Sequence, residues 1–450
     1  MKIALINPKG TFFSKNEKYK KFWNNVRDAD KHTVLSTRLD FWSGFSLGLL
    51  IIAALTPEEH EISLIDENIE QVDFKEKYDL VCISAITQTA TRAYYLADKF
   101  RQRDCKVIVG GIHPTLMPEE AVEHADSVVI GEVETIWSTV LKDVEDGRLK
   151  RCYKSASYFN LRNSPVPRYD LLDIEHYKMV WIQTSRGCPH DCEFCAASKV
   201  FGLKYRHKSI DQVMREIDYV IDTWGNYQIN FADDNIFFNK KYANDLLDRI
   251  EPLKIRWAAS TDVSVGYDEK FLEKLRRSGC TILLIGFESI NEDNLKGLSK
   301  NDWKRRRVKD YPMLIQRIQS HGIGIMGAFL VGFDNDKSSV FNDVANFILD
   351  TNLYASQITV PTPLPGTRLR ERLTAEKRLL ESSWDKYTFL DVNYAPKHLT
   401  IDELEAGVLD IYMRVYNKEA RLSVARHFKQ IFSDMAKVQS KSNDQLAPRT

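Results

Sequence analysis

The stretch Thr184-Ser-Arg-Gly-Cys188-Pro-His-Asp-Cys192-Glu-Phe-Cys195 decides how the rest of the chain is interpreted. Its three cysteines follow a C-x3-C-x2-C spacing, directly after an apolar run that begins at Trp181. Thiolates so close in sequence can face one metal centre from a single loop, and thiolates are the ligands of iron–sulfur clusters. A four-iron cluster held by three thiolates keeps one iron without a protein ligand, and that iron can bind a small molecule. The spacing therefore predicts Cys188, Cys192 and Cys195 as the ligands of a catalytic [4Fe-4S] cluster.

Two simpler interpretations of these cysteines stay open at this point. A zinc site could combine them with His190 or His207, although zinc sites more often use paired C-x2-C halves. The three cysteines could also be ordinary thiols. The rest of the chain bears on this choice, because a zinc ribbon does not predict the repeated strand–helix units that follow the motif.

The composition is that of an ordinary globular protein with two or three domains. The 450 residues are 43% apolar and 28% charged. Lys and Arg number 63, as do Asp and Glu, so the formal net charge is zero. A neutral chain carries no field suited to polyanions over its whole surface, and we expect no nucleic-acid partner. The four cysteines outside the motif are predicted to be buried thiols rather than a disulfide framework; they are Cys82, Cys105, Cys152 and Cys280.

The sequence predicts a cytoplasmic protein without a transmembrane segment. Met1 opens a predicted strand rather than a signal peptide. The most apolar run, Leu47 to Leu55, is too short to span a membrane and is followed by Pro57. A reducing compartment would also suit an exposed iron–sulfur cluster.

Residues 1–150 predict a doubly wound parallel sheet. Apolar strands in β–α alternation form parallel sheets that are covered on both faces, and ligands bind at the carboxyl ends of their strands. The predicted strands are 2–7, 61–65, 79–84, 106–110 and 127–131, and the predicted helices are 45–56, 89–103, 117–124 and 133–145. Residues in the loops after the strands are the binding candidates: Asn7, Ser84, Thr87, Gly110, Gly111, His113, Gly131 and Glu132.

Four further segments complete the predicted organisation. An insert at 10–44 is too long and too aromatic for a plain linker, so it either lines a hydrophobic substrate site or packs against the second domain. Residues 151–180 form a linker, because prolines interrupt any regular element there. Residues 368–437 are predicted to form a charged helical region, and residues 438–450 a polar, disordered tail.

Residues 181–367 predict a partial (βα)6 barrel. The helix at 210–224 is the best defined, since Ser209 and Gln212 form a capping box at its start. The basic run that starts at Lys304 is interpreted as a solvated helix face, with a phosphate contact as the alternative. The predicted strands are 181–185, 227–231, 255–260, 281–287, 323–331 and 356–360.

Reacting groups lie at the carboxyl ends of the strands in such barrels. The cysteines follow the first predicted strand, and Asp234, Ser260 and Glu288 follow or end the next three. Each of these acidic residues could instead cap a helix or pair with a neighbouring loop. Polar groups at successive strand ends favour an enzyme over a zinc ribbon.

With Phe194 before the last cysteine, the motif resembles that of the radical S-adenosylmethionine (SAM) superfamily. The wording "TSRGCPHDCEFCAASKVFG" resembles the branch that carries an N-terminal cobalamin-binding domain, and "VGGIHPTLMPEEAVEHADSVVIGEVE" is similar to such domains. The D-x-H-x-x-G motif, which supplies a histidine to cobalt in some cobalamin proteins, is absent. The resemblance therefore implies cobalamin held without that histidine; the alternative is a doubly wound scaffold that binds no cofactor.

The resemblance also implies the chemistry. SAM would bind the open iron, and one electron would cleave it to methionine and a 5'-deoxyadenosyl radical. Phe194, Asp234, Ser260 and Glu288 would contact the cluster or SAM, and the loop residues of the first domain would contact cobalamin. The electron donor would be a flavodoxin or a ferredoxin.

Over residues 1–400 the chain resembles hopanoid methylases and anaerobic magnesium-protoporphyrin ester cyclases. This resemblance implies a methyl transfer to an unactivated carbon of a hydrophobic small molecule, a lipid or a tetrapyrrole-like compound. A radical SAM oxidoreductase or cyclase without methyl transfer is the alternative. An RNA methylthiotransferase is a further one, but it would need three more cluster cysteines, and Cys82, Cys105 and Cys152 lie far apart in sequence.

Overall fold

The structure, a computed structural model, describes residues 1–10, 17, 19–22, 24, 45–177, 179–225 and 228–446, the last nine as backbone only. The described chain forms two compact units. Residues 45–234 and 362–395 belong to the first unit with the N-terminal strand, and residues 235–361 and 396–446 belong to the second. Most of the predicted insert at 10–44 lies outside the described residues.

The first unit contains a six-stranded parallel sheet in the order β2-β1-β3-β4-β5-β6. Because β1 pairs with both β2 and β3, the order of the strands reverses beside β1, and doubly wound sheets bind ligands at such a point. The strands are β1 (Lys2–Asn7), β2 (Glu61–Asp66), β3 (Leu80–Ser84), β4 (Lys106–Gly110), β5 (Ser127–Ile130) and β6 (Cys152–Lys154).

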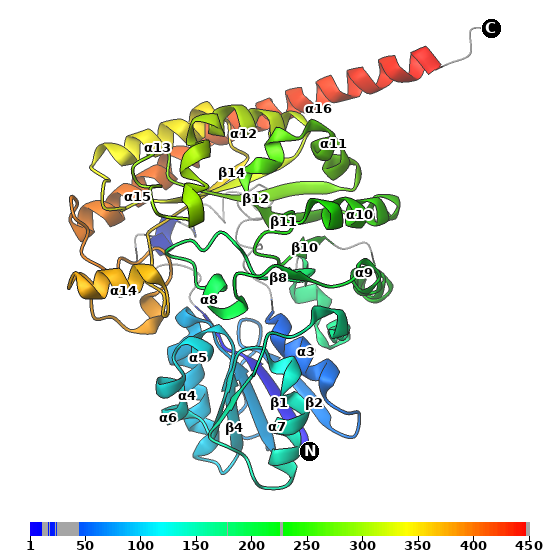
Figure 1. Ribbon diagram of the computed structural model, residues 1–450, viewed down its shortest axis with the longest axis vertical. Coiled ribbons are helices and arrows are strands. Elements are labelled where there is room, and N and C mark those ends of the chain that lie inside the picture. Colours follow the sequence, from blue (N-terminus) through cyan, green and yellow to red (C-terminus); the bar gives the residue numbers. More distant parts are fainter. Residues whose placement is uncertain are drawn as a thin grey trace. The chain divides into compact units, whose positions relative to one another are not determined.

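Helices cover both faces of this sheet (Figure 1). On one face α3 (Leu47–Leu55) contacts α7 (Trp137–Glu145), and on the other α4 (Ala90–Arg101) contacts α6 (Pro118–His124), which contacts the short α5 (Ile112–Leu116). Apolar side chains of β3, β4 and α4 form one buried cluster between these layers. The predicted doubly wound sheet is confirmed.

One strand of this sheet and one helix beside it were not predicted. The three-residue strand β6 alternates exposed, buried and exposed residues, so it has no apolar run, and α5 contains Pro114, which favours a turn in sequence reasoning. The position of β6 corrects one prediction: Cys152 is exposed, because it points to the solvent side of an edge strand. Cys82, Cys105 and Cys280 are buried, as expected.

A second parallel sheet contains six strands, two in the first unit and four in the second. In the first unit β10 (Ile229–Phe231) pairs with β7 (Val180–Ile182). In the second unit β11 (Trp257–Thr261), β12 (Cys280–Glu288), β13 (Gly324–Leu330) and β14 (Ala355–Thr359) pair in that order. The helices that alternate with these strands are α9 (Ile210–Trp224), α10 (Lys240–Ile250), α11 (Glu269–Arg277), α12 (Tyr311–Ser320) and α13 (Ser339–Asp350). This alternation confirms the predicted α/β class.

Helix α9 forms as its sequence predicts. The Gln212 N–H donates to Ser209 Oγ at 3.3 Å, and the Ser209 N–H donates to Gln212 Oε1 at 2.9 Å, which completes the capping box. Gly225 ends the helix at a φ of 73°. Gln212 Nε2 also donates to the Leu161 carbonyl at 3.1 Å, so the cap holds the segment that connects the two sheets.

The C-terminal helices divide between the units. Helix α14 (Arg368–Ala375) belongs to the first unit, and α15 (Ile401–Val415) and α16 (Lys418–Leu446) belong to the second. The hydroxyls of Tyr412 and Tyr416 bond to both the N–H and the C=O of Ile358 and Ser356, so they satisfy the backbone of strand β14. The backbone of residues 438–446 continues α16 where the sequence predicts a disordered tail, and residues 447–450 lie outside the described part.

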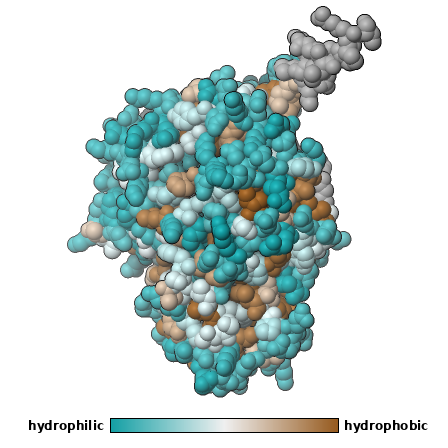
Figure 2. Space-filling model, turned by 45° about the vertical axis from the view of Figure 1, so that its right-hand side comes forward, coloured by the Kyte–Doolittle hydropathy of each residue, from teal (hydrophilic) through white to brown (hydrophobic). Residues whose placement is uncertain are grey.

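The surface is mostly hydrophilic on the face that Figure 2 shows, and apolar residues gather there in a few patches. Among the described helices, none is both long and apolar enough to cross a membrane.

Candidate functional site

The three motif cysteines lie on one loop of the first unit. A two-stranded antiparallel ribbon, β8 (Ser185–Arg186) and β9 (Arg206–His207), brackets this cysteine loop, residues 187–205. The loop contains a short helix, α8 (Ala197–Phe201), and the half-buried Phe194. All three cysteine residues are half-buried. The Cys188 N–H donates to the Gly202 carbonyl at 3.3 Å, which draws the two sides of the loop together.

Gly187 and Asp234 adjoin the first cysteine. Gly187 has a φ of 91°, and a Cβ there would lie 2.4 Å from the Lys204 carbonyl oxygen, so only glycine fits. Its N–H donates to the carboxylate of Asp234. Neighbouring protein atoms desolvate this carboxylate, and desolvation raises its pKa to about 6 despite the hydrogen bond. The residue as a whole remains open to solvent. Burial, and next the charge of Asp234, raise the pKa of the Cys195 thiol to about 12. The structure thus places Asp234 beside the cysteine loop.

Helix α14 holds the cysteine loop from the other side. Arg368 Nη2 donates to the Asp191 carbonyl at 2.5 Å, and Arg372 Nε donates to Glu193 Oε1 at 2.6 Å. The Leu369 N–H also donates to the Glu193 carbonyl at 3.1 Å. Sequence reasoning missed these contacts, because they join residues almost 180 positions apart.

The donor set of the loop fits an iron–sulfur cluster. No three of the described His, Cys, Asp and Glu side chains already stand in a metal-binding geometry, so the chemistry of the donors decides. His207, a candidate for the zinc alternative, has its Nδ1 2.8 Å from the Lys208 carbonyl oxygen. Three thiols on one loop are the donors that a cluster with one open iron requires.

The other two predicted SAM contacts lie in the second unit. Ser260 is half-buried on β11, and Glu288 ends β12 with a φ of 65°. Lys304 Nζ donates to Glu288 Oε1 at 2.9 Å and to the Gly286 carbonyl at 2.5 Å. Lys304 is therefore buried and paired, which corrects the prediction of a solvated face for this residue.

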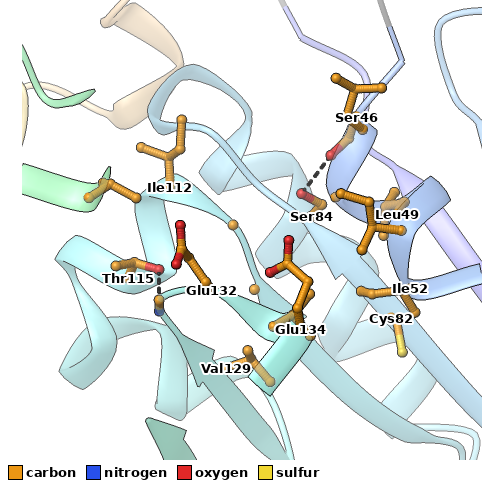
Figure 3. Close-up of a pocket in the computed structure, with 18 of the residues that line it drawn as sticks. Ser46, Leu49, Ile52, Cys82, Ser84, Ile112, Thr115, Val129, Glu132 and Glu134 are labelled. Carbon is orange, nitrogen blue, oxygen red and sulfur yellow. Dashed lines mark hydrogen bonds between the residues drawn. The ribbon is translucent and has the colours of Figure 1, made fainter. Parts of the chain in front are cut away.

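A cavity of about 240 Å³ lies at the carboxyl ends of β3, β4 and β5 (Figure 3). Its walls are mostly apolar and include Leu49, Ile52 and Val129. Five predicted residues line it, namely Ser84, Gly110, Gly111, Gly131 and Glu132. Such walls at the strand ends of a doubly wound sheet fit a bulky, partly apolar organic group.

The three remaining predicted residues of this sheet do not line the cavity. Asn7 Nδ2 donates to Asp66 Oδ1 at 3.0 Å. His113 is fully buried in α5, with Nδ1 3.4 Å from Thr87 Oγ1 and its ring 4.8 Å from that of Trp384. Burial lowers the pKa of His113. The described lining of the cavity contains no histidine.

The fold itself requires glycine at position 111. Its φ is 100°, and a Cβ there would lie 2.7 Å from the Ala85 carbonyl oxygen and 2.9 Å from the Ala85 nitrogen. The close approach lets the His113 N–H donate to the Ala85 carbonyl at 3.0 Å, which shapes one wall of the cavity.

Glu132 has a role that the sequence did not predict. Both of its carboxylate oxygens accept hydrogen bonds from arginines, Arg186 and Arg206, and one also accepts from the Phe159 N–H. Burial alone would raise its pKa, but these donors outweigh burial and lower it. The sequence does show that Glu132 is a charged residue within a mostly apolar stretch, which indicates a buried ion pair. Local sequence does not show which charged residue is its partner.

Comparisons with known proteins agree with this arrangement. Residues 182–348 match the Radical SAM superfamily, and residues 43–141 match the B12 binding domain. The chain is 30% identical over 384 residues to a bacteriochlorophyllide d C-12(1)-methyltransferase of Chlorobaculum tepidum, covering 83% of each chain.

Two further relatives are named for other substrates, and one of them for a cyclisation. A hopanoid C-2 methylase of Rhodopseudomonas palustris is 26% identical, covering 83% of this chain and 72% of the relative. An anaerobic magnesium-protoporphyrin IX monomethyl ester cyclase of Cereibacter sphaeroides is 25% identical, covering 84% and 67%.

The fold is that of a solved methyltransferase. The radical SAM methyltransferase TsrM of Kitasatospora setae, with cobalamin and a [4Fe-4S] cluster bound, superimposes with a TM-score of 0.67 at 15% identity. The match covers 91% of this chain and 88% of that one.

Proposed function

This chain belongs to the B12-binding radical SAM enzymes, and from that membership we propose that it is a cobalamin-dependent C-methyltransferase of a tetrapyrrole-like substrate. The observation that carries the proposal is the cysteine loop joined, within one compact unit, to the cavity of the N-terminal sheet. A methyl donor in that cavity would then lie in the same unit as the site of radical formation. The bacteriochlorophyllide methyltransferase, at 30% identity over most of both chains, supports methyl transfer and this substrate class.

The residues have distinct roles in this proposal. When bound, the cluster and SAM supply a 5'-deoxyadenosyl radical, and cobalamin supplies the methyl group. Cys188, Cys192 and Cys195 would hold the cluster. Asp234, which the Gly187 N–H already orients, would accept a hydrogen bond from the amino group of SAM. In the second unit Ser260 and Glu288 would contact SAM, with Lys304 fixing the Glu288 carboxylate.

We also propose that cobalamin is held without a histidine ligand to cobalt. The walls of the cavity offer apolar contacts to the cofactor and exclude water from it. No histidine is among the described lining residues, and His113 faces Thr87 and Trp384 instead.

A second candidate is a radical SAM cyclase or oxidoreductase without methyl transfer. The cyclase relative favours it, because that protein matches over 84% of this chain. The two candidates differ in stoichiometry. A methyltransferase would consume a second SAM as the source of the methyl group and would therefore form S-adenosylhomocysteine, whereas a cyclase would form only 5'-deoxyadenosine and methionine from SAM.

The test begins with anaerobic reconstitution with iron, sulfide and hydroxocobalamin, followed by desalting. The loaded protein is then incubated with a low-potential reductant, SAM labelled in its methyl group, and a panel of bacteriochlorophyllide, magnesium-protoporphyrin ester and hopanoid substrates. Equal amounts of 5'-deoxyadenosine and S-adenosylhomocysteine, with a labelled methyl on one tetrapyrrole, support the proposal. A modified product without the label and without S-adenosylhomocysteine supports the cyclase, and Cys192→Ala should form none of these products.

A further inference from the structure

The loop that follows β5 links the cofactor cavity to the cysteine loop. We propose that Glu132 and Glu134 of this loop hold both ends of the cysteine loop through Arg186 and Arg206, so that binding in the cavity and binding of the cluster are thermodynamically coupled. Arg186 is the positioning residue in this arrangement. The inference rests on the proposed function, because it requires both cofactors.

Both ends of the cysteine loop meet at one carboxylate. Arg186 and Arg206 are cross-strand partners in the β8–β9 ribbon, at the start and end of the loop. Glu132 Oε1 accepts from Arg186 Nη1 at 3.1 Å and from Arg206 Nη2 at 2.9 Å. Its Oε2 accepts from Arg206 Nη1 at 3.0 Å. A shift of Glu132 would therefore move both ends of the loop together.

Each of the three side-chain nitrogens of Arg186 donates a hydrogen bond in this network. Its Nε donates to Gln183 Oε1 at 2.8 Å, and its Nη2 donates to Glu134 Oε1 at 2.6 Å, in addition to the bond with Glu132. The side chains of Arg186, Glu132 and Glu134 are 7%, 3% and 2% exposed. Two carboxylates and two guanidiniums balance in charge, and the planar fork of arginine fixes their geometry. Arg186 lies two residues before Cys188, so the position of Arg186 fixes the backbone that leads to the first thiol.

The same residues form walls of the cavity. Gly131, Glu132 and Glu134 line it on one side, and Arg186 and Phe201 of the cysteine-loop region also line it. Figure 3 shows Glu132 and Glu134 on one loop with both carboxyl groups directed away from the strand ends. The Gly131 N–H donates to Thr115 Oγ1 at 3.0 Å, which fixes the start of this loop. A molecule that fills the cavity therefore contacts both sides of the ion-pair network.

The ion-pair network is part of the cavity wall and also holds the cysteine loop, so cobalamin and the cluster should each stabilise the binding of the other. Each cofactor orders residues that the other also requires, so the second to bind meets a site that is already ordered. Linkage requires the effect to be reciprocal: if the cluster tightens cobalamin binding by some factor, cobalamin tightens cluster binding by the same factor.

The test measures the Kd of hydroxocobalamin with and without the cluster, under anaerobic conditions, for the full chain. A second readout is the half-life of the reconstituted cluster against a ferrous chelator, with and without hydroxocobalamin. The variants are Glu134→Gln, which removes one charge at constant shape, and Arg186→Lys, which keeps the charge but loses the fork. The matched control is Glu67→Gln, since Glu67 is also buried and bidentate with an arginine, Arg92, but does not line the cavity.

In the parent protein we expect the cluster to lower the Kd of hydroxocobalamin by about fivefold or more. In Glu134→Gln and Arg186→Lys the ratio of the two Kd values should fall toward one, and hydroxocobalamin should no longer prolong the cluster half-life. Glu67→Gln should keep the parent ratio. A simple loss of fold would lower both affinities and the thermal midpoint of the apo protein, without a selective change in the ratio.

Three outcomes overturn the inference. A parent ratio of one shows no coupling, and a parent ratio retained in both variants shows that another route carries it. A parent protein that retains no corrinoid overturns the proposed cofactor together with this inference, whereas the first two outcomes leave the proposed function standing.

Discussion

Asp233 and Asp234 are sequence neighbours with different surroundings. Asp233 is buried and accepts hydrogen bonds from the Thr184 N–H, Thr184 Oγ1 and Ser185 Oγ, whereas Asp234 is open to solvent. Asp233 thus braces the backbone before the cysteine loop, and Asp234 remains available for a ligand. A strand-end pattern alone does not distinguish the two, because both follow the end of β10 and the path of the loop decides which side chain points inward.

The buried Asp233 predicts a specific pH dependence of stability. Burial raises its pKa from 3.8 to about 6, so the folded state binds this proton more tightly than the unfolded state. The stability of the parent should therefore fall as pH rises from about 4 to about 6, by about 2–3 kcal/mol from this group. Asp233→Asn should lack that decrease. Chemical denaturation at pH 4.5 and pH 7 measures it, with Asp222→Asn on the exposed side of α9 as control. A pH-independent difference between Asp233→Asn and the parent would contradict the prediction.

His113 provides a second test at the residue scale. Its ring is fully buried and faces Thr87, Glu120 and Trp384 rather than the cavity. His113→Gln should therefore lower the thermal midpoint but leave the bound hydroxocobalamin spectrum and stoichiometry unchanged. A shift of the corrinoid absorption in the variant would show that this histidine reaches cobalt.

At the scale of elements, helix α14 acts as a brace for the cysteine loop. The Arg372–Glu193 pair is only partly exposed, and it anchors the segment between the second and third cysteines. Arg372→Met should therefore shorten the half-life of the cluster against a ferrous chelator by about two- to tenfold, which corresponds to about 0.4–1.4 kcal/mol. Arg168→Met, which breaks an ion pair with Asp170 away from the loop, is the matched control. Equal half-lives in the two variants would show that α14 does not brace the loop.

The regular elements were predictable because their signals are local. Lys2–Asn7 and Lys106–Gly110 are uninterrupted apolar strands, and their bounds match the prediction. The β8–β9 ribbon has two residues in each strand, too few for any periodic pattern. It is held by pairs such as Glu132–Arg206, which are 74 positions apart. Sequence reasoning therefore named the cysteines, Asp234 and Glu132 as candidates, and their roles stay predictions, but it could not foresee the ion-pair network of Glu132.

At the scale of the whole molecule, the first compact unit should respond to the corrinoid. Hydroxocobalamin at about 100 times its Kd should stabilise the fold by about 2.7 kcal/mol, because it binds only the folded state. For a unit of this size that is a rise of about 5–10 °C in thermal midpoint. Differential scanning calorimetry of the cluster-free protein measures the shift. Ile52→Trp, which adds bulk to the cavity wall, should abolish it, and an equal shift in that variant would place the corrinoid elsewhere.

The discontinuity of the first unit has a consequence for synthesis on the ribosome. Residues 362–395 complete this unit, but the ribosome adds them long after Asp234. At about 5–20 residues per second, the interval is on the order of 10 s. During that time the nascent chain carries the cysteine loop without Arg368 and Arg372, the residues that later hold Asp191 and Glu193. The three thiols of the emerging polypeptide are thus synthesised well before α14, the helix that holds their loop in the folded chain.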